Sequence, residues 1–146
     1  MMNTYLNRLA NYFEHGKNIG VIGRGETIEK SFTDAAFAMF ALMTNPESIH
    51  LREIITFEFT EEDKELALIT WLNTLLSKSK EHNLILIDFR LKREGNVWSA
   101  TVSGEKWQDH MPRHMEVKAA TKTSLSVEKI DHNWEAKCVL SVESKT

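Results

Sequence analysis

The feature of this chain that most restricts its fold is a run of apolar residues spaced like one face of a helix. Thr27 can cap a helix that begins at Ile28, and the following apolar positions recur at steps of three and four residues. These positions are Ile28, Phe32, Ala35, Ala36, Met39, Phe40 and Met43. We expect this helix to bury one stripe against a sheet and to end near Asn45-Pro46, because proline disfavours a helical residue before it.

A second amphipathic helix is predicted later in the chain. Thr60 with Asp63 approximates a capping box, and apolar residues at helical spacing follow until about His82. These residues are Leu66, Ile69, Leu72, Leu75 and Leu76. Across both helices, we expect Phe32, Ala36, Met39, Phe40, Leu66, Ile69, Leu72 and Leu76 to be mostly buried.

Strand-like segments surround the two helices. Ile19 to Ile22 reads as a strand that ends in a turn at Gly23-Arg24-Gly25, and Ile55, Phe57 and Phe59 alternate with polar residues. Further strands are expected at about 84–92, 97–102, 116–121, 125–130 and 134–142, with a long irregular stretch from Lys106 to Met115. This order predicts an α+β domain with mostly antiparallel pairing.

Size and charge limit the classes of function. A chain of 146 residues is the size of one domain, so we expect a single domain over residues 1–146 with residues 1–10 as an N-terminal extension. Net charge is −3, which does not favour autonomous nucleic-acid binding. Without a secretory signal pattern or an apolar run of about 20 residues, we expect a cytoplasmic protein away from the membrane.

Isolated reactive side chains offer only weak signals. His110 and His114 have a spacing that zinc sites use on helices, but Pro112 lies between them and no third ligand is near in the sequence. A lone histidine such as His15 is more often structural than a general base. Cys138 shares an alternating apolar face and is expected to be a core thiol rather than a nucleophile.

Four segments of the chain resemble signature regions of the archease family. They are Glu14 to Gly20, Ser31 to Asn45, Thr70 to Leu76, and Val117 to Thr121. The resemblance extends over roughly Tyr12 to Val142. It implies an archease-like α+β domain in which mostly antiparallel sheets are combined with two amphipathic helices.

Typical archeases carry acids at three matching positions, where the resemblance implies a divalent-cation site that holds calcium in typical members. In this chain those positions hold Asn18, Asn45 and Ser141. Because calcium affinity depends on the number of charged ligands, we expect neither a metal nor another cofactor here. Lys17 stands where relatives carry a small residue. Its ammonium group either occupies the space of the cation or points into solvent.

The family resemblance implies a non-catalytic accessory protein. Archeases are associated with the RNA-splicing ligase that depends on GTP and manganese, so the resemblance implies promotion of ligase guanylation and turnover in tRNA splicing or RNA repair. RNA would be reached only indirectly, through the ligase. The residues expected to bind the partner are Lys118, Glu105, His15 and Lys17. Two alternatives remain: a chaperone-like interaction module without the metal-dependent role, and an enzyme that uses His110 and His114.

Overall fold

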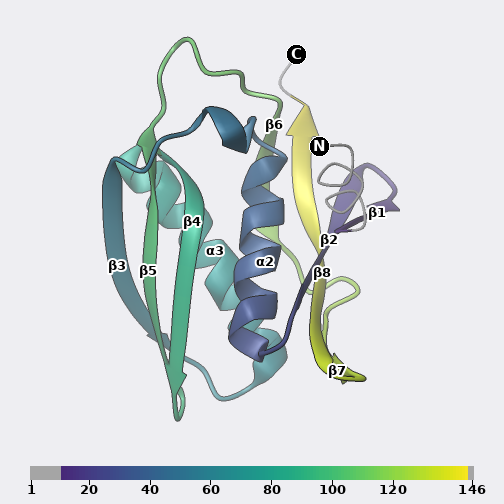
Figure 1. Ribbon diagram of the computed structural model, residues 1–146. Helices are drawn as coiled ribbons and strands as arrows, with labels where there is room; N and C mark the ends of the chain where they lie inside the picture. The colour runs from purple at the N-terminus through teal and green to yellow at the C-terminus, as the bar shows by residue number, and fades with distance from the viewer. Residues whose placement is uncertain (1–10, 145–146) are drawn as a thin grey trace.

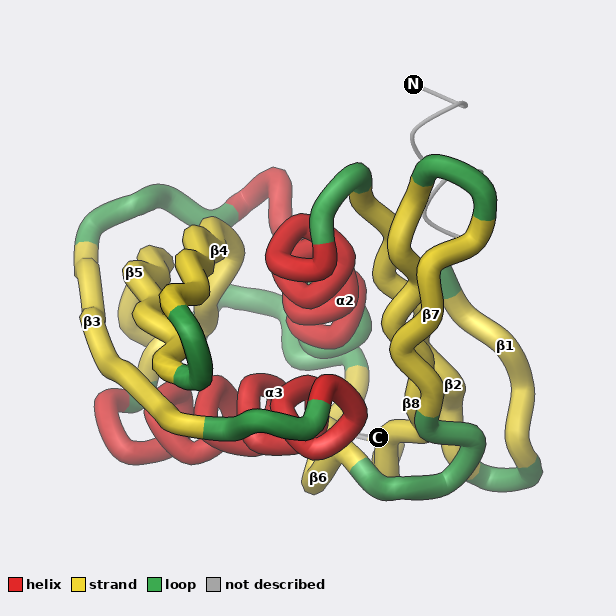
Figure 2. The backbone as a smooth tube through the Cα atoms, turned by 90° about the horizontal axis from the view of Figure 1, so that it is seen from below, coloured by secondary structure: helices red, strands yellow, loops and turns green. Residues whose placement is uncertain are grey.

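The computed structural model describes residues 11–144, so the expected N-terminal extension over residues 1–10 lies outside the described residues. Two sheets enclose the first long helix (Figure 1). Helix α2 (Ile28–Ala41) packs on β2 (Asn18–Gly25) and β8 (Asn133–Ser144) on one side and on β4 (Leu84–Glu94) on the other. Figure 2 shows α2 between the two sheets, with α3 (Lys64–His82) running across one end of the molecule. The α+β class predicted from the sequence is confirmed.

Both sheets are antiparallel throughout. Within residues 11–144, the first has five strands: β1 (Tyr12–His15), β2, β8 and β6 (Met115–Ala120) follow one another in this order, and β7 (Ser126–Ile130) pairs with another part of β8. The second sheet has three strands in the order β3 (Glu53–Thr60), β5 (Val97–Lys106) and β4. The strands expected from residue 84 onward are therefore all present, with ends shifted by a few residues.

Helix α2 follows the predicted face but ends earlier than expected. Thr27 caps it by accepting a hydrogen bond from the backbone N–H of Lys30, and all seven stripe positions are buried. The helix ends at Ala41 because its last turn tightens, with N–H groups bonding carbonyls three residues back instead of four. Asn45 instead caps a short 3₁₀ helix, η1 (Pro46–Ser48).

Helix α3 corrects two details of the prediction. Asp63, not Thr60, caps it by accepting from the N–H of Leu66 at 3.0 Å, because Thr60 is still the last residue of β3. Leu66 is 38% exposed instead of buried. The indole N–H of Trp71 donates to the Phe32 carbonyl at 2.8 Å, which turns Trp71 toward α2. Leu66 lies five positions earlier, so it points about 140° away around the helix.

The expected turn at Gly23-Arg24-Gly25 is also wrong, because these residues continue β2. Gly23 is required by packing. A Cβ atom there would lie 2.1 Å from the carbonyl oxygen of Ser31, so glycine lets α2 approach the strand. The glycine that suggested a turn in the sequence instead marks a close contact between two backbones.

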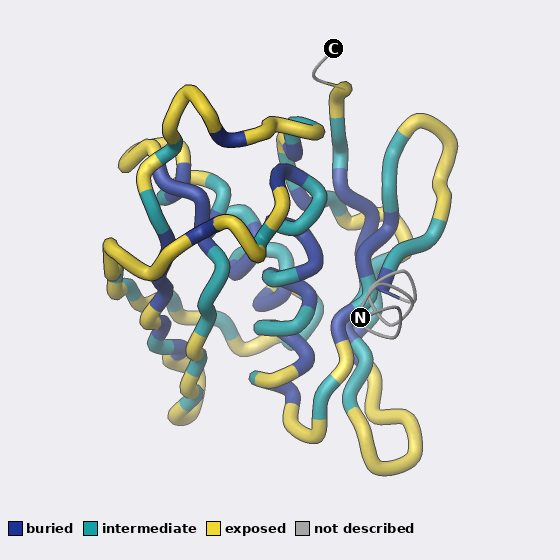
Figure 3. Tube along the Cα trace, turned by 45° about the horizontal axis from the view of Figure 1, so that its top comes forward, coloured by how far each residue is buried: buried dark blue, intermediate teal, exposed yellow. Residues whose placement is uncertain are grey.

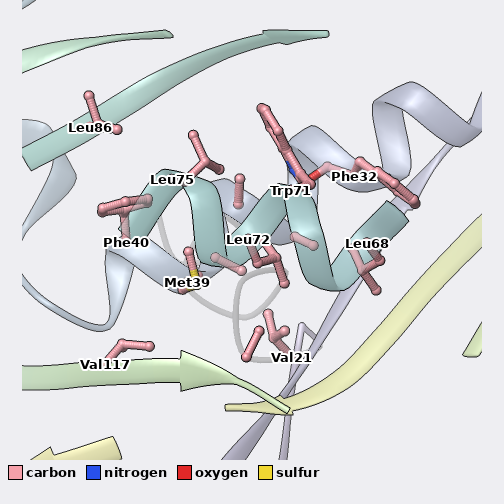
Figure 4. Close-up of a cluster of buried hydrophobic side chains, with 14 of the residues drawn as sticks. Val21, Phe32, Met39, Phe40, Leu68, Trp71, Leu72, Leu75, Leu86 and Val117 are labelled. Carbon is pink, nitrogen blue, oxygen red and sulfur yellow. The ribbon is translucent and has the colours of Figure 1, made fainter. Parts of the chain in front are cut away.

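Aromatic rings fill the space between the helices and the three-stranded sheet. Trp98 stacks on Phe32 with ring centroids 5.1 Å apart, and Phe59 stacks on the Trp98 ring at 5.8 Å. Phe40 stacks on Phe89 at 5.6 Å. Figure 4 shows Phe32, Phe40 and Trp71 within one continuous cluster. Offset stacking of this kind adds to the stabilisation from burial.

Burial decreases from this centre toward the loops (Figure 3). Ile69 and Leu76 are half-buried against the core, while Cys138 is fully buried. Burial raises the pKa of the Cys138 thiol to about 12, so the thiol stays protonated at neutral pH, which agrees with its expected place in the core. Neither long helix within residues 11–144 has the length and apolarity needed to cross a membrane.

Candidate partner-binding surface

A tight hairpin carries the first family-like segment. His15 pairs with Asn18, which leaves Gly16 and Lys17 as a two-residue loop. Gly16 has a φ of +62°, the conformation that the first position of such a loop requires and that glycine adopts without strain. The side chains of His15 and Lys17 are exposed, so both are accessible to a partner.

Asn18 and Ser141 lie on neighbouring strands. The amide oxygen of Asn18 accepts a hydrogen bond from the backbone N–H of Val142 at 3.2 Å. This bond attaches the hairpin to β8 next to Ser141. The structure therefore brings two of the three positions expected at the family's cation site into one neighbourhood, and uses the amide oxygen of Asn18 there as a hydrogen-bond acceptor.

The side chain of Asn45, the third position, accepts a hydrogen bond from within its own segment. It is exposed, and its amide oxygen accepts from the N–H of Glu47 at 3.2 Å, which caps η1. A hard cation favours charged oxygen ligands, whereas these positions offer neutral side chains and two amide oxygens already engaged with backbone N–H groups. The residues present therefore do not fit the cation. Within residues 11–144, no three His, Cys, Asp or Glu side chains are grouped as metal ligands.

The loop between β5 and β6 is fastened to the end of α2. The hydroxyl of Thr44 donates to the Pro112 carbonyl at 2.7 Å, and the N–H of His114 donates to the Met43 carbonyl at 2.9 Å. The irregular stretch is thus residues 107–114, inside the expected limits. Both His110 and His114 are exposed within it and do not lie on a helix, so the helical geometry of a zinc pair is missing.

Glu105 holds in place the loop between η1 and β3. Its carboxylate accepts from the backbone N–H of His50 at 2.9 Å and from the Arg52 guanidinium at 3.1 Å. The backbone bond from His50, aided by Arg52, lowers the pKa of Glu105 below its ordinary value. Only 12% of this side chain is exposed, so Glu105 does not form the accessible surface expected for a partner contact. No local pattern of residues signals this pairing, because its partners lie 55 and 53 positions away.

Lys118 is exposed at a bulge in β6. The register of β6 with β8 shifts between Val117 and Ala119, which leaves Lys118 as an extra residue. Its ammonium group lies 3.3 Å from the Glu143 carboxylate, with side chains 50% and 61% exposed. An ion pair this exposed exchanges readily with water, so the lysine is available to an incoming group.

Asn73 is a site residue that residue patterns alone did not single out. Its side-chain amide accepts from the N–H of Ala120 at 2.8 Å and donates to the carbonyl of the same residue at 3.1 Å. A polar residue between Leu72 and Leu75 on the buried face of α3 was the available signal. Through these two bonds α3 fixes the position of β6, and with it Lys118.

Comparison with known proteins agrees with this architecture. A family model described as "Archease protein family (MTH1598/TM1083)" matches residues 11–142. A protein named archease from Pyrococcus abyssi is 33% identical over 135 residues, which covers 88% of this chain and 94% of the relative. Another from Methanosarcina mazei is 31% identical over 140 residues, or 90% and 94% of the two chains.

Solved structures show the same fold. The solution structure of protein 1598 from Methanobacterium thermoautotrophicum has a TM-score of 0.78 and 25% identity, and covers 89% of this chain and 96% of that one. The crystal structure of an archease from Thermotoga maritima, described as a possible chaperone, has a TM-score of 0.62 and 22% identity, covering 88% and 93%. The family match spans both sheets and both helices. The chain belongs to the archease family.

Proposed function

We propose that this protein is an accessory factor that promotes guanylation and turnover of a GTP- and manganese-dependent RNA-splicing ligase, in tRNA splicing or RNA repair. The observation that carries the proposal is the family match over residues 11–142. In this role the nucleotide and the manganese belong to the ligase, and RNA is reached through it. The protein itself acts through a surface and needs no catalytic side chain.

The exposed residues that are expected to bind the partner define the surface that supports this role. His15 and Lys17 lie at the tip of the β1–β2 hairpin, and Lys118 lies at the β6 bulge. All three are exposed. Glu105, the fourth residue expected to bind the partner, contributes by fixing the loop at His50 and Arg52, since its carboxylate is engaged there.

Co-incubation with a cognate ligase tests the proposal. The rate of ligase guanylation should rise when the protein is present, and ligation should continue for many turnovers instead of stalling. Lys118→Glu should remove this acceleration. Lys122→Glu, at an exposed lysine just beyond β6, is the matched control and should retain it. Guanylation unchanged by the protein, measured with the wild-type pair, contradicts the proposal.

A chaperone-like interaction module is the second candidate. It is favoured by the replacement of the family's acids with Asn18 and Asn45, whose amide oxygens accept backbone N–H groups. A module of this kind binds its partner but does not speed guanylation. Measuring binding and guanylation with the same ligase preparation therefore separates the two candidates: binding with acceleration supports the activator, and binding without it supports the module.

A further inference from the structure

A groove runs between the C-terminal half of α3 and strand β6. It has a volume of about 500 Å³, and the loop after β5 closes part of it with Trp107 and Arg113. Figure 2 shows α3 and β6 side by side at this end of the molecule. The side chains that determine its binding chemistry are Leu76, Lys80, Trp107, Arg113, Val117 and Lys118.

One wall of the groove is the outer edge of a sheet. Strand β6 ends the order of the first sheet, and within residues 11–144 its partner strand is β8. On the other edge of β6, Asn73 makes with Ala120 the pair of bonds that a neighbouring strand would make, at 2.8 and 3.1 Å. Residues 115–118 of β6 continue from this point along the groove. An extended backbone can therefore add to this edge where the Asn73 side chain stops.

The charge of the groove is opposite to that of the whole protein. Lys80, Arg113 and Lys118 line it, whereas Glu116 is the one acidic residue among the described residues that do so. The chain as a whole has a net charge of −3. Arg113 is positioned by Trp107, whose ring centroid lies 4.0 Å from the guanidinium carbon. The groove thus concentrates positive charge at one place on an acidic protein, which attracts a negatively charged ligand.

The apolar part of the lining distinguishes among negatively charged ligands. Leu76 and Val117 lie in the groove together with the three cationic residues. An extended peptide points successive side chains to opposite faces, so alternating acidic and apolar residues can meet both kinds of surface. The bases of a nucleic acid can stack on aromatic side chains, but its ribose–phosphate backbone has no peptide groups that could pair with the edge of β6. An acidic peptide therefore fits more of the groove than a nucleic acid does.

We propose that this groove binds an extended acidic segment of the partner protein, which pairs with the edge of β6 and places carboxylates beside Lys80, Arg113 and Lys118. The identity of the partner rests on the proposed function, but the binding chemistry does not. A carboxylate of the segment would replace Glu143 as the partner of Lys118, whose present ion pair is exposed. The groove would then be the docking site for this segment. His15 and Lys17 lie outside the groove, on the β1–β2 hairpin.

A fluorescent synthetic peptide that alternates glutamate and valine tests this inference without any ligase. The wild-type protein should bind it, with affinity falling as salt rises. The double variant Lys80→Glu/Arg113→Glu should bind about tenfold or more weakly. The matched control Lys92→Glu/Lys129→Glu reverses two exposed charges on β4 and β7 and should bind like the wild type. No binding by the wild type, or equal loss in both double variants, overturns the inference.

Two further measurements establish where the peptide binds and whether RNA binds there instead. On peptide addition, the amide chemical shifts of the wild type should change along residues 115–118 and the facing turns of α3. Changes confined to β3 or β7 overturn the inference. This measurement uses only the wild type, so it holds even if a variant fails to fold. A single-stranded RNA oligonucleotide of equal charge should compete poorly, and stronger binding of the RNA overturns the choice of a peptide. Because these titrations contain no ligase, failure of ligase activation leaves their result intact.

Discussion

The aromatic core and the β8 end of the molecule are built in opposite ways. We define the aromatic core as Phe32, Phe40, Phe59, Trp71, Phe89 and Trp98, and the β8 end as Asn18, Lys118, Ser141 and Glu143. The core is held by ring contacts and burial. The β8 end is held by the hydrogen bond from the Val142 N–H to the Asn18 amide oxygen and by one exposed ion pair. Because the two regions rely on different contacts, we expect the surface chemistry of the second to change without altering the packing of the first.

The largest expected effect is the loss of stability when a buried side chain of the core is shortened, compared with an exposed one on the same helix. Phe40→Ala should lower the free energy of unfolding by about 3 to 5 kcal/mol, and Leu68→Ala by about 2 to 5 kcal/mol, through lost burial and residual cavities. Leu66→Ala on the same helix as Leu68 should cost under about 1 kcal/mol, because Leu66 is exposed. Urea unfolding of the three variants measures this. Equal costs for Leu66 and Leu68 would show that the rotation of α3 is misassigned.

The core was the more predictable of the two regions. The stripe of α2 follows from spacing alone, since Phe32, Met39 and Phe40 all lie on the face that the spacing selects. The rotation of α3 was predicted only in part. Leu72 and Leu75 are buried as expected, but the buried stripe also includes Leu68 and Trp71, whereas the prediction included Leu66 and Ile69. Residues 68, 71, 72 and 75 have the spacing of one helical face, so the sequence held the signal for the correct rotation.

For the surface, the resemblance to the archease family supplied more than the residue patterns did. The family resemblance pointed to Asn18, Asn45 and Ser141, and the structure places Asn18 against the residue after Ser141. The bonds of Glu105 to His50 and Arg52 depend on how the loops fold back, because the partners lie 55 and 53 positions away, and no spacing in the sequence indicates such contacts. The cap of η1 by Asn45 is local, and an Asn followed by a Pro is a sequence signal for a turn of this kind.

The second largest effect should come from placing acids at the three positions that the resemblance implies for a cation site. Asn18→Asp, Asn45→Asp and Ser141→Asp together should create stabilisation by calcium of about 3 to 4 kcal/mol when free ion exceeds the dissociation constant by about 100 to 1,000 fold. Without calcium, repulsion among the carboxylates should destabilise the variant. Thermal unfolding with calcium or with a chelator measures both effects. Asn96→Asp, in an exposed turn, is the control and should not respond to calcium.

A smaller effect on stability is expected at Glu105, which belongs neither to the aromatic core nor to the β8 end. The lowered pKa of Glu105 means that its contacts stabilise the fold at neutral pH, and that this contribution is lost as the pH falls through the folded pKa. Glu105→Gln should therefore unfold at a lower temperature than the wild type at pH 7, with the difference closing in acid. Melting curves from pH 7 downward test this, and Glu128→Gln serves as an exposed control. A constant difference at every pH would contradict the assignment.

The smallest expected effect on stability is at Lys118. Its ion pair with Glu143 is exposed on both sides, so Lys118→Glu should change the free energy of unfolding by about 0 to 1 kcal/mol. The same variant should lose the ability to activate the ligase. Urea unfolding measured beside guanylation checks the two results. Global unfolding by Lys118→Glu would show that this residue belongs to the structural framework and not to the partner surface.

Calcium titration of the unmodified protein by calorimetry tests most directly the central claim, that this archease keeps the family fold without the cation chemistry implied at Asn18, Asn45 and Ser141. Calcium affinity falls as charged ligands are lost, and these three positions supply none. We expect no heat beyond dilution up to millimolar calcium, from a protein whose melting curve shows it to be folded. Saturable binding of calcium at one site per chain would contradict the claim.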